Sequence, residues 1–509
     1  MKPMVADVCL ILEGTYPFVT GGVSSWVHEL IKGMPDLTFS LLHISASRSL
    51  AQEPRYEMPD NVVSFVECFV HDPVVHHDRC RKWTPWSQRE LWRAIDAFHR
   101  APMDHKVLPF AQMMQGSACP ATRILNTADL LLSRKSWRYL VDHYKQANPG
   151  GSFIDFFWTW RAVHMPIFQI LNAETPPARL YHIVSTGYAG LAGIVAKTRT
   201  GRPLLLTEHG IYVKERKIEI NRADWIYTAP ERVAAIKDKP SVLKRIWIDN
   251  FLVLGKLCYE YCDQIFTLYG GNQQLQLEFG APADRLEIIP NGVKTDIFAP
   301  LRDVPRPNDG IRRVGFVGRV VPIKDVKCFI KACRLCAEHV DNVEFLILGP
   351  TDEDQQYYKE CVTLVALLGM QDKIKFCGRV DVRQYYPKLD VFVLTSISEG
   401  QPLTILEAAC AGVPTVSTDV GSCSELLLGR TDEDRAIGPS GIITNIGKPK
   451  ETGEALVRLL ADEGLRQSMI QAGYERIERY YRQDQVIETY HNIYQRWMPA
   501  ADQRKAKVS

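Results

Sequence analysis

The sequence predicts an α/β protein made of two doubly wound, Rossmann-like domains that face one another across a cleft, and three observations lead to this fold class. With 509 residues, the chain exceeds the size at which one hydrophobic core keeps growing, so two cores are expected. Short apolar runs alternate with amphipathic stretches, which is the alternation of strands and helices found in βαβ units. These runs are continuously apolar rather than alternating, which is typical of parallel strands covered on both faces.

The first domain is expected over residues 1–300, on the acceptor side of the cleft. Two helical insertions interrupt its rhythm, one near 70–150 that is rich in Trp and Arg, and one near 213–250. A polar, Pro-rich stretch at 299–309 is the expected linker. The strands of this domain are predicted near Val5–Leu12, Thr38–His43, Tyr181–Val184, Pro203–Thr207, Gln264–Leu268 and Leu286–Ile289.

The second domain is expected over residues 301–480, with helices beginning near 325, 353 and 402. Residues 481–509 are expected to form a C-terminal helix that packs back towards the N-terminal domain. The strands of the second domain are predicted at Arg313–Val317, Val343–Leu348, Ile374–Phe376, Val391–Thr395 and Thr415–Ser417.

Composition and charge exclude several function classes. The 61 basic and 59 acidic side chains nearly cancel, so no overall field favours nucleic acid. The most apolar candidate for a membrane span, Phe251–Leu268, contains Lys256, Glu260 and Asp263, which argues against direct membrane insertion. Thirteen cysteines, several of them inside apolar segments, indicate buried reduced thiols. The sequence therefore predicts a soluble, cytoplasmic protein.

Two loops at predicted strand ends of the first domain carry polar or glycine residues. Gly21 and Gly22 directly precede a helix expected from about Val23, where backbone amides are free to approach an anion or a sugar. His209 follows the strand that ends at Thr207, where its imidazole could hydrogen-bond a sugar or an incoming hydroxyl. Taken singly, the glycines are also compatible with a tight turn, and His209 with an ordinary loop residue.

The corresponding loops of the second domain carry two cations and two carboxylates. Arg319 and Lys324 lie in the turn after the first strand, where both could converge on one diphosphate. Glu399 lies in the loop that leads to Pro402, which suits the first turn of a helix, and Glu407 lies within that helix. The free amides around Leu403 and Thr404 would then form a phosphate cradle.

Together these segments resemble family four of the glycosyltransferases, which have the GT-B fold. The resemblance rests on Gly318-Arg319 followed by Lys324, on the Glu-x7-Glu pair Glu399 and Glu407, on Ile289-Pro290-Asn291-Gly292-Val293, and on the paired glycines Gly21 and Gly22. With the opening Ile11–Pro17 and the loop Thr207–Tyr212, nearly the whole chain is similar to the cytosolic glycosyltransferases of bacterial Pel exopolysaccharide systems.

This resemblance implies a donor site for a UDP-sugar. Arg319 and Lys324 would hold the diphosphate, Glu407 the ribose, and Glu399 the hydroxyls of the sugar. The backbone at Arg379 and Val380 would contact uracil, and His209 would lie beside the donor sugar. The expected donor-binding set is completed by Gly21, Gly22, Gly400, Pro402, Leu403 and Thr404.

The resemblance further implies a retaining hexosyl transfer to a growing exopolysaccharide, by same-face attack, without a metal or another cofactor. Partner proteins of the Pel system would recruit the enzyme to the inner membrane. Two other functions stay open at this point, a nucleotide-sugar epimerase of the same fold and a non-catalytic scaffold that binds nucleotide-sugars.

Three groups of potential metal ligands are interpreted as structural. Asp352-Glu353-Asp354 is expected to cap a helix, and Asp432-Glu433-Asp434 to lie in a polar loop. The cluster from His71 to Cys80 lacks a defined zinc spacing, and Cys333 and Cys336 fall within a predicted helix.

Overall fold

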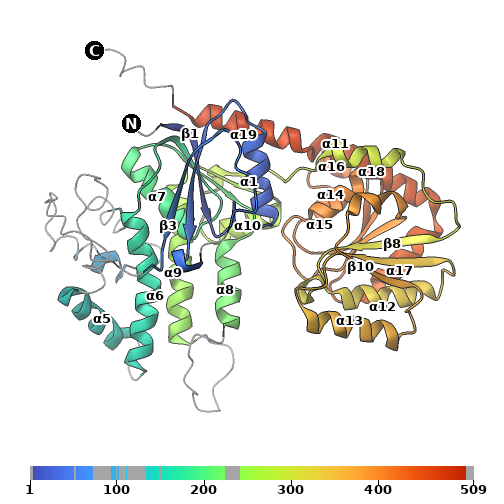
Figure 1. The fold of residues 1–509 in the computed structure, drawn as a ribbon, viewed down its shortest axis with the longest axis horizontal. Helices are drawn as coiled ribbons and strands as arrows, with labels where there is room; N and C mark the ends of the chain where they lie inside the picture. Colours follow the sequence, from blue (N-terminus) through green and yellow to red (C-terminus); the bar gives the residue numbers. More distant parts are fainter. Residues whose placement is uncertain are drawn as a thin grey trace. The chain divides into compact units, whose positions relative to one another are not determined.

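The computed structural model describes residues 4–50, 53–72, 133–147, 151–223 and 241–499, together with nine positions between 93 and 111. The chain divides into two compact units (Figure 1). Unit 1 comprises Met1–Thr267, Gln274–Glu287 and the segment from Tyr490, whereas unit 2 comprises Leu268–Gln273 and Ile288–Thr489. The boundary was expected at residue 300, so the expected linker at 299–309 lies inside unit 2, where Ala299–Asp303 forms a 3-10 helix.

Unit 1 is built on a seven-stranded sheet with the order β3-β2-β1-β4-β5-β6-β7. Its central strand β1 pairs in parallel with β2 and β4. The strands are β1 (Ala6–Glu13), β2 (Phe39–Ser45), β3 (Val62–Phe69), β4 (Ala178–Ile183), β5 (Leu204–Glu208), β6 (Gln264–Thr267) and β7 (Leu286–Ile288). The helices are α1 (Gly22–Lys32), α5 (Arg134–Ala147), α6 (Phe153–Asn172), α7 (Tyr188–Thr200), α8 (Tyr212–Arg222), α9 (Val242–Tyr261) and α10 (Gly270–Glu278), of which α10 begins in unit 2.

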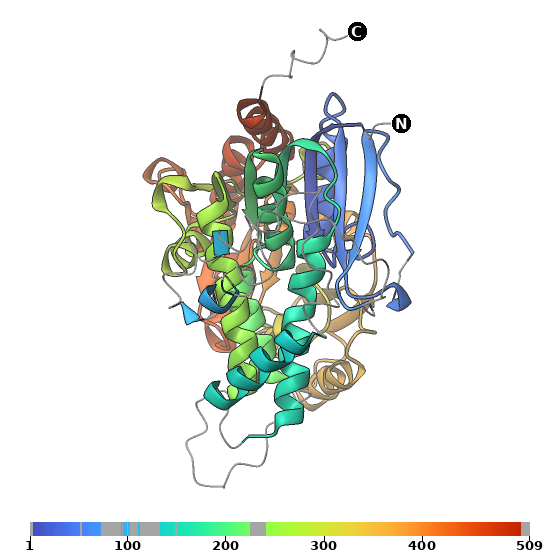
Figure 2. The same cartoon turned by 90° about the vertical axis from the view of Figure 1, so that its left-hand side faces the viewer.

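Helices cover this sheet because its strands are apolar on both faces. One face packs against α6, α7 and α9, which Figure 2 shows in teal, green and yellow-green. Their side chains Trp160, Leu191 and Leu257 join the main core. On the other face, Tyr494 of the C-terminal helix contacts Phe39 of β2 edge-on, at 6.4 Å between ring centroids. The burial of Val8–Leu12 in β1 is what the apolar run in the sequence predicts.

Strand β3 was not among the predicted strands. Polar Ser64 and Glu67 interrupt its apolar residues, and most of its side chains are half-buried because β3 lies at the edge of the sheet. The two expected insertions contain helices where they are described, namely α5, α8 and part of α9. Residues 73–92 and 224–240 of these insertions lie outside the described residues.

Unit 2 is built on a six-stranded sheet with the order β10-β9-β8-β11-β12-β13, and β13 was not among the predicted strands. The strands are β8 (Arg312–Val317), β9 (Val343–Leu348), β10 (Ile374–Gly378), β11 (Val391–Leu394), β12 (Thr415–Thr418) and β13 (Gly441–Thr444). The helices are α11 (Thr295–Phe298), α12 (Val326–Ala337), α13 (Gln355–Leu367), α14 (Leu403–Cys410), α15 (Cys423–Leu428), α16 (Asp432–Arg435), α17 (Pro449–Ala461), α18 (Glu463–Tyr480) and α19 (Gln483–Trp497), of which α19 ends in unit 1.

Two cores enclose the sheet of unit 2, one on each face. The first includes Phe329 of α12, Cys361 of α13 and Leu456 of α17. The second includes Leu406 of α14 and Ile477 of α18, and Figure 1 shows these helices on the opposite side of the strands from α12 and α13. The prediction of parallel, doubly covered sheets is therefore confirmed in both units.

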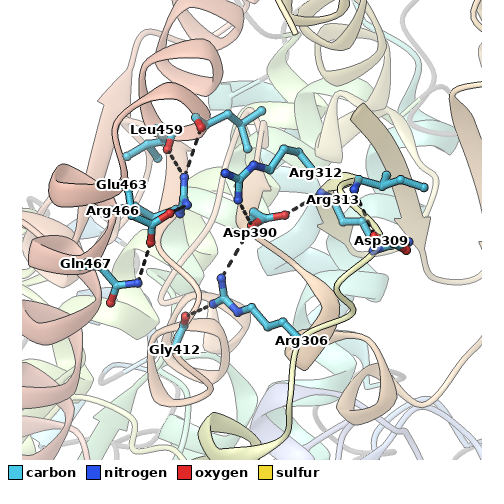
Figure 3. A network of polar contacts seen from close by, with 12 residues as sticks. Arg306, Asp309, Arg312, Arg313, Asp390, Gly412, Leu459, Glu463, Arg466 and Gln467 are labelled. Carbon is cyan, nitrogen blue, oxygen red and sulfur yellow. Dashed lines mark hydrogen bonds and ion pairs between the residues drawn. The ribbon is translucent and has the colours of Figure 1, made fainter. Parts of the chain in front are cut away.

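Arginines join the amino-terminal edge of this sheet to the neighbouring helices (Figure 3). Asp390, just before β11, accepts hydrogen bonds from the Arg313 amide at 2.8 Å and from Nη1 of Arg312 at 3.2 Å. Arg306 lies beside Asp390 and donates to the Gly412 carbonyl, while the buried Arg466 donates to the Leu459 carbonyl. These contacts lie at the strand starts, so they leave the carboxyl edge of the sheet free for other side chains.

Among the described residues, no helix combines the length and apolar character needed to cross a bilayer. Cys333 and Cys336 are buried free thiols of α12, in agreement with a structural role. Asp354 caps α13 as expected, because its carboxylate accepts a hydrogen bond from the Tyr357 amide. The expectation of a polar loop at 432–434 was wrong, since α16 forms there and Asp434 is buried against Arg476 at 2.7 Å.

Candidate functional site

A salt bridge lies at the carboxyl edge of the unit 2 sheet, between the loops that follow β8 and β11. Nζ of Lys324 donates to Oε1 of Glu399 at 2.5 Å, and the Ser396 hydroxyl donates to the same oxygen at 2.5 Å. The side chains of Lys324 and Glu399 are only 21% and 13% exposed. The structure thus brings together two of the predicted site residues and adds Ser396, which the sequence analysis did not single out.

Backbone contacts hold these two loops against one another. The Thr395 hydroxyl donates to the Lys324 and Asp325 carbonyls at 3.1 and 3.0 Å, and the Ile397 amide donates to the Ile323 carbonyl at 2.8 Å. Thr395 itself is fully buried. The position of Lys324 opposite Glu399 therefore depends on hydrogen bonds to main-chain carbonyls, and not only on attraction between the two charges.

A third loop, after β12, closes on the same place. The Ser422 amide donates to the Gly400 carbonyl at 2.9 Å. Gly421 has a φ of +56°, and a Cβ there would lie 2.3 Å from the Gly400 oxygen, so only glycine fits. The Ser422 hydroxyl is buried and has no hydrogen-bond partner in the structure, which suggests that a ligand or a water completes this site.

Glu407 lies within α14 and points to a tyrosine of the same core. Its Oε2 accepts a hydrogen bond from the Tyr386 hydroxyl at 3.0 Å. Burial raises the pKa of Glu407 above its ordinary value, and the bond from Tyr386 opposes this rise. Glu407 is therefore not the solvated surface charge that an isolated glutamate in this helix would suggest.

The amino-terminus of α14 is open for an anion. Pro402 precedes the helix without a side-chain cap, so the amides of Leu403 and Thr404 have neither an intrahelical acceptor nor a capping oxygen. Gln401 ties this turn to the Pro290-Asn291-Gly292 segment, since its Oε1 accepts from the Asn291 amide at 2.7 Å. Gln401 was missed by the sequence analysis, because nothing in its local pattern indicates a contact 110 residues away.

The structure places Arg319 on a different partner from Lys324. Its guanidinium donates to Glu353 at 2.7 Å, and its side chain is 54% exposed. Arg379 and Val380 follow β10, the edge strand next to β9, where Arg379 is exposed and Val380 half-buried. Arg319 and Lys324 therefore lie at the same edge of the sheet, but each is held by its own carboxylate.

The other predicted residues lie in unit 1. Gly21 and Gly22 are exposed at the start of α1, and no side chain caps this helix. His209 follows β5 and contacts Trp26 edge-on, with 4.7 Å between ring centroids. Burial lowers the pKa of His209 to about 4, so its imidazole is neutral at physiological pH.

Two glutamates at strand ends of unit 1 were not predicted as site residues. Glu13 ends β1 and accepts from the Tyr188 amide at 2.7 Å and from the Tyr212 hydroxyl at 2.6 Å. Glu208 ends β5, is fully buried, and accepts from the Tyr259 hydroxyl at 2.8 Å and from the Tyr212 amide at 3.1 Å. Burial raises the pKa of both glutamates, and both fix the loop on which His209 lies.

The described residues contain no group of three or more His, Cys, Asp or Glu side chains that could hold a metal ion. From the predicted cluster near His71, only His71 and Asp72 are described, and Asp72 binds Ser47 at 2.8 Å. Asp434 of the second acidic run is engaged by Arg476.

Two family models match the chain, one in each half. A family model described as "Glycosyl transferases group 1" matches residues 311–462. This match lies within unit 2 and covers less than a third of the chain, while the two parallel-sheet units together have the GT-B fold. The chain belongs to the family described as "Domain of unknown function (DUF3492)", whose model matches residues 6–284, more than half of the chain.

A curated relative and two solved structures are similar to the chain. D-inositol 3-phosphate glycosyltransferase of Paenarthrobacter aurescens is 27% identical over 207 residues, which are 38% of this chain. The match spans 48% of that relative, about half of its length. Sucrose-phosphate synthase of Thermosynechococcus elongatus has a TM-score of 0.57 at 15% identity, over 96% of this chain and 99% of its own. Anabaena HepE in complex with UDP and glucose has a TM-score of 0.54 at 14% identity, over 96% and 99%. At these identities, the two structures show the fold alone.

Proposed function

We propose that the protein is a retaining glycosyltransferase that transfers a hexosyl unit from a UDP-sugar to a growing exopolysaccharide of the Pel type. One observation carries this proposal: Lys324, Glu399 and Ser396 converge at the carboxyl edge of the unit 2 sheet, beside the uncapped start of α14. Ligands of doubly wound sheets bind at this edge. The known complexes of Anabaena HepE with UDP and UDP-glucose support a UDP-sugar as the donor.

The chemistry requires stabilisation of a departing diphosphate. When the anomeric bond breaks, negative charge develops on the leaving UDP while an oxocarbenium-like centre forms on the sugar. Lys324, the amides of Leu403 and Thr404, and Arg319 after release from Glu353 would oppose this charge. Each preorganised donor in a dry site contributes on the order of 3 kcal/mol. No metal or other cofactor enters this scheme.

The configuration at the anomeric carbon would be retained because the acceptor attacks this carbon on the face from which the diphosphate leaves. The acceptor oxygen forms its bond to the anomeric carbon on that face, and the acceptor proton passes to an oxygen of the leaving diphosphate. A covalent alternative needs a free carboxylate as nucleophile. Glu399 is a poor candidate, since Lys324 and Ser396 both donate to its Oε1, and this favours a role in holding sugar hydroxyls.

The remaining expected residues take supporting roles in the proposal. Glu407, oriented by Tyr386, would accept the ribose hydroxyls, and the backbone at Arg379 and Val380 would contact uracil. Neutral His209 would donate to or accept from the donor sugar, with Gly21 and Gly22 approaching it closely. The resemblance to the cytosolic glycosyltransferases of Pel systems suggests Pel partner proteins that recruit the enzyme to the inner membrane.

A binding screen tests the proposal. Thermal unfolding would be recorded with UDP, GDP and ADP, followed by hydrolysis of UDP-hexoses with and without a chelator. Stabilisation by UDP alone, with chelator-resistant release of UDP, is expected. A ligand present at 100 times its Kd raises the free energy of unfolding by about 2.7 kcal/mol. Stabilisation by none of the nucleotides would favour a scaffold, and interconversion of the hexose without transfer would favour an epimerase.

A further inference from the structure

Large apolar side chains are exposed on the helical arm formed by α5 and the first half of α6. Trp137 of α5 is 51% exposed, and Ile154 and Trp158 of α6 are 66% and 60% exposed. Ile154 and Trp158 are four residues apart and therefore lie on one face of their helix. Trp137 also contacts Phe153 and Phe157, at 5.6 and 6.2 Å between ring centroids, so the apolar surface continues from one helix to the other.

The buried side of the arm explains why these residues remain outside. Leu140 of α5 and Phe156 and Trp160 of α6 join the core of unit 1. Ile154 and Trp158 project from the side of α6 opposite to Phe156 and Trp160, and the exposed Trp137 is not part of that core. Exposed apolar side chains that gather in a patch, rather than lying singly, mark surfaces that bind a partner.

The charge of the arm is unlike that of the whole chain. The two helices contain five basic residues, Arg134, Lys135, Arg138, Lys145 and Arg161, against two acidic ones, Asp142 and Asp155. The full chain has 61 basic and 59 acidic residues. None of the five basic side chains forms an ion pair with another described residue. Arg134, Trp137 and Arg138 share one side of α5, and Arg161 lies one turn beyond Trp158 on α6.

We infer that this arm docks on the surface of an anionic lipid bilayer. The docking face consists of Arg134, Trp137, Arg138, Ile154, Trp158 and Arg161. Helices that lie in a membrane interface combine Trp, Phe or Leu on one face with Lys and Arg beside them. Trp prefers the headgroup level because its ring is apolar and its indole N–H is polar. Cations that form no ion pair with another described residue, next to apolar rings, match an anionic headgroup layer above an apolar interior.

This inference does not depend on the proposed activity, because no residue of the docking face belongs to the candidate site. It differs from recruitment by partner proteins, since the chain itself would contact the lipid. Each Lys or Arg near an anionic surface strengthens binding about five-fold, and salt screens this contribution. Binding should therefore be reversible and should weaken as the ionic strength rises.

Vesicle flotation of the full-length protein tests the inference. One vesicle type would contain only phosphatidylcholine, and the other three parts phosphatidylcholine to one part phosphatidylglycerol. The wild type is expected to float with the anionic vesicles and to stay behind with the neutral ones. Arg134→Gln with Arg138→Gln should lower the partition coefficient by about five-fold per residue. Trp137→Ser with Trp158→Ser should lower it at least as much.

Matched changes in unit 2 serve as controls. Leu367→Ser removes a side chain that is 79% exposed, and Lys450→Gln removes a cation whose side chain is 80% exposed. Both variants should float like the wild type, and every variant should keep its thermal unfolding midpoint. The inference is overturned if the wild type does not float with anionic vesicles, or if the docking-face variants float like the controls. Self-association that is lost in Trp137→Ser, without vesicle binding, would also overturn it and would assign the face to a second copy of the chain.

Discussion

At the scale of single residues, the candidate site depends on Lys324. Its ammonium group lies 2.5 Å from Glu399 in a half-buried position, whereas Arg319 is exposed and bound to Glu353. A cation held in place before the ligand arrives loses little energy to reorganisation when charge develops. Of the two cations, Lys324 is therefore the one that the apoprotein already positions.

Lys324→Ala should lower turnover by at least about two orders of magnitude, because it removes a preorganised donor to the leaving diphosphate. Arg319→Ala should have an effect of similar size. Steady-state kinetics with a UDP-hexose measure both. Lys327→Ala is the matched control, since Lys327 lies one turn away on α12 and is paired with Glu360 at 2.6 Å. Unchanged turnover in either variant would remove that residue from its proposed role.

Glu407→Gln should separate binding from stability. The amide can still accept the bond from Tyr386, but the buried negative charge is gone. The pKa of Glu407 is raised in the fold, so its contribution to stability falls as pH rises above its ordinary value of 4.5. The variant is expected to be at least as stable as the wild type at pH 7, yet to bind UDP about ten-fold more weakly. Calorimetry and thermal unfolding measure the two quantities, and a loss of stability without a loss of affinity would contradict the assignment.

At the scale of elements, the loop after β11, which contains Glu399 and Gly400, is held in place by neighbouring loops. The loop after β12 approaches it so closely that Gly421 has no room for a side chain. Gly421→Ala should displace Gly400 and abolish stabilisation by UDP. Gly447→Ala is the matched control in unit 2, because Gly447 also has a positive φ, +66°, but nothing within 4 Å of a new Cβ. The control should lose only about 1–2 kcal/mol of unfolding free energy and keep UDP binding. Equal UDP binding in the two variants would contradict this account.

The C-terminal helix α19 holds strands β4 and β5 through a buried chain of hydrogen bonds. The Tyr494 hydroxyl lies 2.7 Å from Nδ1 of His182, His182 lies 2.8 Å from the Thr207 hydroxyl, and Thr207 lies 2.9 Å from the Tyr490 hydroxyl. Tyr494→Phe should cost about 1–3 kcal/mol, because it leaves His182 without this partner. Urea unfolding measures the loss. Tyr480→Phe is the control, since the buried Tyr480 hydroxyl has no partner in the structure, and an equal loss there would argue against the role of the chain.

The sequence predicted the elements better than the contacts between them. Strands β1, β8 and β9 were predicted to within a residue at each end, because an apolar run makes up most of each strand. The sequence also predicted that Lys324 and Glu399 lie in loops after strands and that Glu407 lies in the helix that follows. Ser396, Gln401 and Tyr386 were missed, because their roles arise from tertiary contacts and their local patterns are ordinary. Glu13 and Glu208 were passed over for the same reason.

At the scale of the whole molecule, the two units differ in the groups that acid affects. Burial lowers the pKa of six histidines of unit 1, so folding opposes their protonation. Their contribution to stability is present above pH 6.5, the ordinary value, and is lost as pH falls towards about 4. Three glutamates of unit 1 with raised pKa act in the opposite sense but are fewer. The six histidines are His43, His71, His143, His164, His182 and His209, whereas the histidine described in unit 2, His339, is exposed.

Unit 1 should therefore unfold before unit 2 when the pH is lowered from 6.5 to 4. Hydrogen exchange of the full-length protein, followed by mass spectrometry of peptides from both units, measures this order. Peptides of β4 and β5 are expected to lose protection at a higher pH than peptides of β8 and β9. Loss of protection in unit 2 first would contradict the expected order.

The central claim is that a UDP-sugar binds around Lys324 and Glu399 in unit 2. Hydrogen exchange of the intact protein with and without UDP tests it most directly, because it locates the ligand on the chain without depending on turnover. The account predicts slower exchange at residues 318–326 and 395–407 when UDP is present, and the same exchange as in the apoprotein for Lys324→Ala. Protection confined to other segments, or no protection at saturating UDP, would contradict it.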